Sequence, residues 1–137
     1  MSKLSEHFNS CEFACPCCGR LPSHGMNPVL INKLEALRHA LGDTPIIVNS
    51  GFRCIAHNMA VGGLPDSQHL FGNAADISVQ SLFDNFSIDD VVSKALGIGF
   101  DGIGRYVSSG FVHLDVRSNG SEPGVYRDWE TDRKSVV

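Results

Sequence analysis

The sequence lacks the excess of basic residues and the long apolar runs that mark several classes of protein. Its 137 residues include 11 Lys and Arg against 15 Asp and Glu, a formal net charge of −4. A nucleic-acid-binding protein needs a basic surface to neutralise phosphates, so we expect no nucleic-acid partner. No apolar run reaches the ~18 residues of a membrane span, so we expect none. Residues 1–8 are too polar for a signal peptide, so we expect no export signal.

Cysteines are few, and their spacing does not suggest a disulfide framework. There are five, at Cys11, Cys15, Cys17, Cys18 and Cys54, and four of them are crowded into eight residues. Cys15 and Cys18 have the C-x2-C spacing of half a structural zinc site, but no second C-x2-C or H-x3-H pair completes it. We expect reduced cysteines packed beneath an N-terminal flap, and a protein built around a structural zinc is the alternative.

The length allows one domain with a real core and leaves no room for a second. We expect this domain to occupy residues 1–129, because the aromatic and charged stretch that ends at Trp129 resembles the close of a domain. Residues 130–137 have no periodicity, no cap and no motif. They are predicted to be a disordered or artefactual tail that contributes nothing to function.

Hydrophobic spacing and caps predict an α+β fold in which helices flank a small, mostly antiparallel sheet. Asn27-Pro28 begins a helix that carries leucines at helical spacing and closes at Gly42. Another helix is expected to start near Ser87 and to stop at Gly97. The remaining elements are a short helix and four strands, expected at 54–61, 46–49, 75–79, 102–106 and 111–116.

Two stretches carry groups that bind metals. In the first, from Ser67 to Ile77, a loop histidine, His69, is followed by Asp76 at the start of a strand. In the second, from Phe111 to Arg117, apolar and polar residues alternate, so His113 and Asp115 share one face of a strand. Two histidines and one carboxylate are the ligands of a catalytic zinc that keeps an open position for water.

Each of these residues also has a simpler explanation. His69 is equally explained as a loop histidine, Asp76 as a strand-end cap, and His113 as a cross-strand neighbour. Arg53, in the turn expected at 50–54 after the first strand, is explained by a salt bridge, and Asp115 by a solvated strand position. The convergence of ligand-type groups at the ends of several elements is what favours the metal site.

Several motifs together resemble the M15 family of zinc D-Ala-D-Ala carboxypeptidases, whose relatives include phage endolysins that cut peptidoglycan stem peptides. The resemblance covers residues 8–129. It rests on His-x6-Asp followed by a strand histidine, and on the segments 50–53, Asn58, 62–63, 67–77, 104–106 and 111–117. It implies a hedgehog/D-Ala-D-Ala-peptidase-like fold and a zinc metallopeptidase that hydrolyses stem peptides as a carboxypeptidase or an endopeptidase.

The resemblance also implies a role for individual residues. His69, Asp76 and His113 are expected to bind Zn²⁺, and Arg53 and Ser67 are expected to contact the peptidoglycan substrate. We expect a monomer that stays in the cytoplasm of a phage-infected or bacterial cell until its release, and that then acts on the cell wall.

One departure from the family concerns the general base. Many relatives have a carboxylate three residues before the last ligand or a histidine two before it, where this sequence has Gly110 and Phe111. Asp115 is therefore predicted to be the catalytic base. A catalytically inactive, metal-containing module that binds the cell wall is the alternative function.

Overall fold

The computed structural model describes residues 3–65, 67–78, 85–117 and 125–127. The predicted domain end at Trp129 and the tail at 130–137 lie outside the described residues. The described residues form two 3-10 helices and three α-helices: η1 (Ser10–Glu12), α1 (Pro28–Ala40), α2 (Ile55–Ala60), η2 (Gln68–Phe71) and α3 (Ile88–Ile98). The strands are β1 (Ile47–Ser50), β2 (Ala74–Ser78), β3 (Gly102–Tyr106), β4 (Phe111–Asp115) and β5 (Val125–Arg127).

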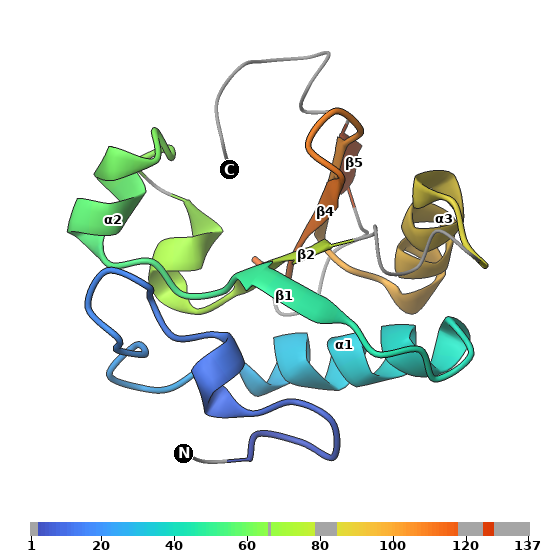
Figure 1. The fold of residues 1–137 in the computed structure, drawn as a ribbon, viewed down its shortest axis with the longest axis horizontal. Helices are drawn as coiled ribbons and strands as arrows, with labels where there is room; N and C mark the ends of the chain where they lie inside the picture. The colour runs from blue at the N-terminus through green and yellow to red at the C-terminus, as the bar shows by residue number, and fades with distance from the viewer. Residues whose placement is uncertain (1–2, 66, 79–84, 118–124, 128–137) are drawn as a thin grey trace.

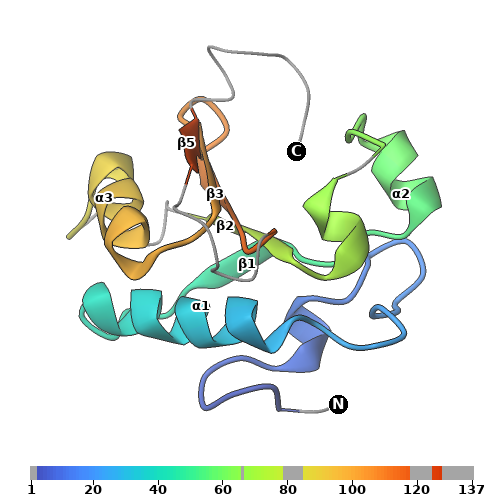
Figure 2. The ribbon, with the colours of Figure 1, turned by 180° about the vertical axis from the view of Figure 1, so that it is seen from behind.

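The strands form one sheet in the order β1-β2-β4-β3-β5. Every pairing is antiparallel except that of β5, which runs parallel to β3 at the edge. In both ribbon views α1 runs beneath the sheet, and α2 and α3 stand at its opposite sides (Figures 1 and 2). The predicted α+β class with a small, mostly antiparallel sheet is therefore confirmed.

The two faces of the sheet have different chemistry because side chains alternate along each strand. One face carries Ile77, Ile103, Val112 and Leu114, which are fully buried against α1 and α3. From α1, the leucines of the predicted apolar stripe enter the same core: Leu30, Leu34 and Leu37, followed by Leu41. The opposite face is left for polar groups, and it carries the candidate site.

Caps account for the ends of the two long helices. Asn27 accepts a hydrogen bond from the Val29 backbone N–H (2.9 Å) at the start of α1, with Pro28 at the first helical position. The prediction that α3 stops at Gly97 was wrong, since the helix continues to Ile98. It ends where Gly99 adopts a left-handed conformation (φ 94°), which glycine accepts without strain.

The first part of the N-terminal lead, from residue 3 to η1, runs along the side of α1 that faces away from the sheet, and the rest loops past the start of α1 below α2 (Figures 1 and 2). Phe8 and Phe13 of the lead are buried in the common core. Glu35 of α1 holds the lead by accepting from Ser5 Oγ (2.5 Å), from the His7 backbone N–H (2.7 Å) and from His7 Nδ1 (2.7 Å). Although partial burial alone would raise the pKa of Glu35, these donors lower it.

Replacing Glu35 tests how much this contact stabilises the fold. We expect Glu35→Gln to lower the free energy of unfolding by about 1 kcal/mol at pH 7, because a charged acceptor of three hydrogen bonds is lost. A group with a lowered folded-state pKa stabilises the fold above its unfolded-state pKa, and this contribution is lost as the pH falls through the folded-state value. The difference between wild type and variant should therefore narrow below pH 4.5.

Urea denaturation of both proteins at several pH values measures this difference. Glu6→Gln is the matched control, because it removes the same charge near His7 from an exposed side chain. The Glu6 carboxylate lies 3.9 Å from His7 Nε2, which is too far for a hydrogen bond. Equal losses of stability in the two variants would contradict a specific role for Glu35.

Candidate metal centre

Three of the predicted ligands come together on the polar face of the sheet. His69 lies in η2, Asp76 in β2, and His113 directly opposite Asp76 in β4. The Oδ1 atom of Asp76 lies 3.2 Å from His69 Nε2 and 2.9 Å from His113 Nδ1. All three side chains are buried, with exposed fractions between 0% and 4%. One ligand atom from each lies within 4.8 Å of the others, as a shared ion requires.

The other nitrogen of each ring has an acceptor of its own. His69 Nδ1 lies 2.6 Å from the Gly51 carbonyl oxygen, which can only accept, so this nitrogen donates. His113 Nε2 lies 2.8 Å from Asp115 Oδ2 and donates to that carboxylate. Neutral rings in these tautomers turn the lone pairs of His69 Nε2 and His113 Nδ1 toward Asp76. Histidines that bind metals are usually oriented by acceptors of this kind.

Positive charge is needed among these groups, because two lone pairs and a carboxylate oxygen would otherwise face one another in a buried space. Protons can serve this purpose: burial alone would lower the pKa of His113, but hydrogen bonds to Asp115 and Asp76 raise it to about 9. A divalent metal ion serves it with a donor set of two imidazoles and one carboxylate, which suits zinc. The residues present therefore fit a zinc ion.

Arg53 contributes a fixed positive charge beside the same carboxylate. Its Nη2 lies 3.4 Å from Asp76 Oδ2, whereas the two histidines contact the other oxygen, Oδ1. Its Nη1 lies 3.2 Å from Asn58 Oδ1. Burial alone would raise the pKa of Asp76, but His69 and His113 hold it below its ordinary range. The carboxylate of Asp76 is therefore ionised and able to bind a cation.

Asp115 lies on the side of His113 away from Asp76, and it is fully buried. Arg117 binds it at both oxygens, through Nε to Oδ1 (2.9 Å) and Nη2 to Oδ2 (2.6 Å). Burial alone would raise the pKa of Asp115, but Arg117 and His113 lower it. Gly102 of β3 lies opposite Asp115, and a Cβ atom there would overlap the carboxylate.

Ser67 is buried at the N-terminal end of η2, where its Oγ accepts the backbone N–H of His69 at 3.3 Å. The sequence predicted a loop around His69, whereas this stretch forms a 3-10 helix that ends at Gly72 in a left-handed conformation (φ 74°). Capping by Ser67 is the contact observed, and the predicted contact of Ser67 with substrate stays a prediction.

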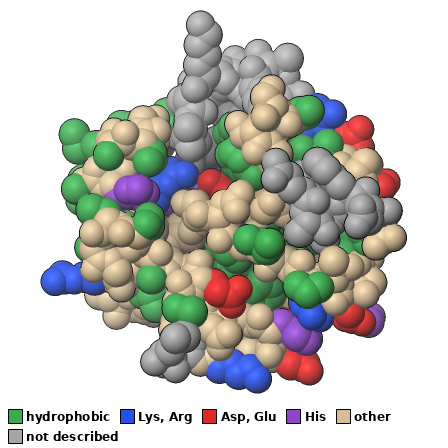
Figure 3. Space-filling view, in the orientation of Figure 1, with side chains coloured by type: hydrophobic (Ala, Val, Ile, Leu, Met, Phe, Trp, Pro, Cys, Tyr) green, Lys and Arg blue, Asp and Glu red, His purple; other side chains and the backbone are tan. Residues whose placement is uncertain are grey.

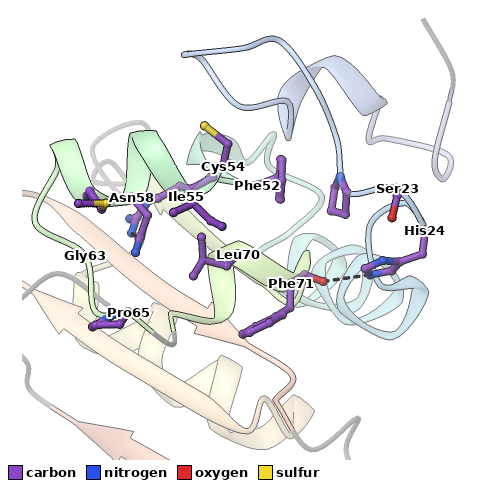
Figure 4. A pocket seen from close by; sticks show the side chains of 13 residues that line it. Ser23, His24, Phe52, Cys54, Ile55, Asn58, Gly63, Pro65, Leu70 and Phe71 are labelled. Carbon is purple, nitrogen blue, oxygen red and sulfur yellow. Dashed lines mark hydrogen bonds between the residues drawn. The ribbon is translucent and has the colours of Figure 1, made fainter.

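A pocket of ≈ 790 Å³ lies next to the three predicted ligands. Arg53 lines this pocket and also contacts Asp76. Asn58 and Gly63 supply polar groups and backbone to the wall of the pocket, and Leu70 and Phe71 extend it along η2 (Figure 4). Apolar side chains also gather at the surface over α2 (Figure 3), where Ile55 and Met59 are 73% and 75% exposed. The pocket can therefore accept a ligand with an anionic group and apolar substituents.

Asn58 and Arg117 also hold the site; both belong to the motifs that carry the family resemblance, but no role was predicted for either. Asn58 positions Arg53 and is itself held by a hydrogen bond from Nδ2 to the Leu64 carbonyl oxygen (2.7 Å). Arg117 fixes Asp115 as described above. Both contacts are local, because Arg53 and Asn58 are 5 positions apart and Asp115 and Arg117 are 2 positions apart.

A family comparison agrees with this geometry. The sequence model described as Peptidase M15 matches residues 6–115, which is most of the chain. The chain belongs to the Peptidase M15 family. The predicted membership is thus confirmed, and the endolysin-like subtype stays a prediction.

A curated relative of this M15 chain is the "Zinc D-Ala-D-Ala carboxypeptidase" of Streptomyces albus G. The two are 53% identical over 49 residues, a segment that covers 36% of the M15 chain. The same segment covers 19% of the relative, so most of that protein lies outside the match. Among the described residues of the M15 chain, none of the helices has the length and apolar character that a membrane crossing requires.

Gly102→Ala should disturb the centre without touching a ligand. The added methyl group would displace the Asp115 carboxylate from His113, so we expect metal affinity to fall by about 10-fold or more. Isothermal titration of the metal-free protein with Zn²⁺ measures this change. Gly97→Ala is the control, because a Cβ atom at that helical position meets nothing within 4 Å. Equal zinc affinity in the two variants would contradict the positioning of His113 by Asp115.

Proposed function

We propose that this chain is a zinc metallopeptidase that hydrolyses a peptide bond in peptidoglycan stem peptides. His69, Asp76 and His113 are the zinc ligands in this proposal. The observation that supports it most directly is that His69 Nε2, His113 Nδ1 and Asp76 Oδ1 converge in a buried cluster. The second nitrogen of each histidine already donates to another acceptor, so the converging nitrogens are free to bind a metal. Membership of the Peptidase M15 family and a relative named a zinc D-Ala-D-Ala carboxypeptidase support the same reaction.

Zinc bound there would supply a Lewis acid that polarises the scissile carbonyl and lowers the pKa of a water molecule. The protein supplies two neutral imidazoles and one carboxylate, which together leave a net positive charge at the metal position. His69, Asp76 and His113 are all buried, so their charges act at low dielectric.

Substrate binding is assigned to Arg53 and the adjoining pocket. A stem peptide ends in a carboxylate, and a guanidinium can bind a carboxylate through two hydrogen bonds. Arg53 lines the pocket while its Nη2 faces Asp76, so an anion bound to Arg53 would lie near the metal position. The apolar surfaces of Leu70 and Phe71 suit the methyl groups of alanine residues. Ser67 remains a second candidate contact.

Asp115 was predicted to be the general base, and that role stays a prediction. Its contacts favour a different one, because it is fully buried, both of its oxygens bind Arg117, and one also accepts from His113. We therefore propose that Asp115 positions His113 and strengthens it as a ligand. In that case the proton from water passes either to another carboxylate of the protein or to the substrate.

Purified peptidoglycan and a synthetic peptide ending in D-Ala-D-Ala test the proposed function. We expect zinc-dependent release of product by the wild type, measured by mass spectrometry of the fragments. Free D-alanine would identify a carboxypeptidase, and larger peptides would identify an endopeptidase. His69→Ala should lose the zinc and at least about 10³-fold in activity, because a three-ligand site rarely survives the loss of one.

His39→Ala is the matched control, since His39 is exposed on α1 and should leave zinc content and activity unchanged. A wild-type protein that carries zinc and binds peptidoglycan but releases no product would instead support the inactive wall-binding module. Full zinc in His69→Ala would contradict the ligand assignment.

Asp115→Asn separates the two roles considered for Asp115. A positioning role predicts that zinc affinity falls by about 10- to 100-fold, and that saturating zinc restores much of the lost activity. A general-base role predicts unchanged zinc affinity and a kcat that falls by about 10²-fold and stays low in excess zinc. We expect the first result. Asp89→Asn is the control, because Asp89 is an exposed residue whose observed contact is with Arg105.

A further inference from the structure

Cysteines that are far apart in the sequence form a second cluster. The thiols of Cys15, Cys18 and Cys54 supply sulfur atoms that all lie within 4.8 Å of one another. Cys15 is buried, Cys54 is partly buried and Cys18 is exposed. The prediction that the cysteines pack beneath an N-terminal flap therefore holds for Cys15. It was wrong for three others, which are exposed: Cys11, Cys17 and Cys18. Cys54 is the partner that the C-x2-C pair lacked in the sequence.

A tight turn brings the first two ligands together. The Gly19 backbone N–H donates to the Cys15 carbonyl oxygen (2.6 Å), and the Cys15 N–H donates to the Arg20 carbonyl oxygen (2.9 Å). Gly19 has a φ of +70°, a left-handed conformation that other residues rarely adopt. The turn therefore reverses the chain within the C-x2-C-G stretch, so that both thiols face the same side.

The distance between sulfur atoms fits a metal ion better than a disulfide. Cys15 Sγ and Cys54 Sγ are 3.7 Å apart, although the residues are separated by 39 positions. Two sulfur atoms bonded to zinc at ~2.3 Å with a tetrahedral angle lie about 3.8 Å apart, whereas a disulfide joins them at about 2.05 Å. In Figure 4 the Cys54 sulfur points out of the pocket and toward the N-terminal lead.

Backbone donors surround the sulfur atoms as they do in thiolate sites. The N–H of Cys54 points to Cys15 Sγ (3.5 Å), and the N–H of His57 points to Cys54 Sγ (3.4 Å). Such donors favour the thiolate, which is the form that binds a metal. Cys17 directly precedes Cys18 in the same turn and is exposed, so its thiol is the next one available to the cluster.

We propose that Cys15, Cys18 and Cys54 bind a second zinc ion of structural type, with Cys17 as the fourth ligand. Structural zinc sites are four-coordinate and commonly all-cysteine, whereas the His69 centre keeps a position open for chemistry. The two sites therefore differ in ligands and in role. The proposal is independent of whether the protein cleaves peptidoglycan.

The second ion would fasten the N-terminal lead to the segment that orients His69. The lead already contacts this segment through the Phe52 N–H, which donates to the Phe13 carbonyl oxygen at 2.8 Å. The same segment also contacts His69: the Gly51 carbonyl oxygen accepts from His69 Nδ1, and the Arg53 N–H donates to the His69 carbonyl oxygen (3.1 Å). Ligation of Cys54 would thus fix residues 51–54 between the lead and η2.

Zinc content of the purified full chain tests the proposal. We expect two equivalents per wild-type chain by elemental analysis and one equivalent in Cys54→Ser. His69→Ala should also retain one equivalent, now at the cysteines. Cys11→Ser is the matched control and should keep both, because Cys11 is an exposed cysteine outside the cluster. One equivalent of zinc in the wild type and in Cys54→Ser, with none in His69→Ala, would overturn the second site and leave the proposed function intact.

A second measurement uses the wild type and does not depend on how Cys54→Ser folds. Alkylation of the native protein should modify Cys11 and spare the other four cysteines until a chelator removes the metal. Substitution with Co²⁺ should produce the thiolate-to-metal charge-transfer bands of a tetrahedral sulfur site. Rapid alkylation of Cys15, Cys18 and Cys54 without chelator would overturn the proposal, as would a Cys15–Cys54 disulfide detected by mass.

Discussion

Burial of the Asp76 carboxylate is the constraint on which the arrangement of the site depends. An unpaired charge in such a place costs several kcal/mol, so the surrounding chain must supply compensating positive groups. Arg53 supplies one at 3.4 Å from Oδ2, and His69 and His113 face Oδ1 at 3.2 Å and 2.9 Å, where a bound cation or proton supplies the rest. The turn that carries Arg53, the 3-10 helix that carries His69 and the register of β2 with β4 are therefore energetically coupled through one carboxylate.

Features that depend on neighbouring residues could be read from the sequence. The alternation in 111–117 assigned His113 and Asp115 to one face of a strand, because the side-chain period of a strand is two. The Asn27-Pro28 start of α1 follows from the needs of unpaired backbone N–H groups. Family membership was also recognisable, since the spacing from His69 to Asp76 is a local pattern.

Features that depend on contacts between distant segments could not be read in this way. Nothing in the spacing of Cys54 indicates that it lies beside Cys15, because a turn in the lead and the start of α2 bring them together only in the folded chain. The 3-10 helix that presents His69 depends on a serine cap and a left-handed glycine rather than on hydrophobic periodicity.

The order of the metal-binding residues along the chain has a consequence for biosynthesis. A polypeptide leaves the ribosome from its N-terminus, so residues near the N-terminus become available for contacts first. The cysteine cluster is complete once Cys54 has emerged, whereas the cluster around Asp76 must wait for His113 in a late strand of the sheet. The nascent chain thus acquires its buried histidine and aspartate cluster only after nearly all of the central sheet has been translated. Any hydrolytic capacity that depends on that cluster is withheld during synthesis.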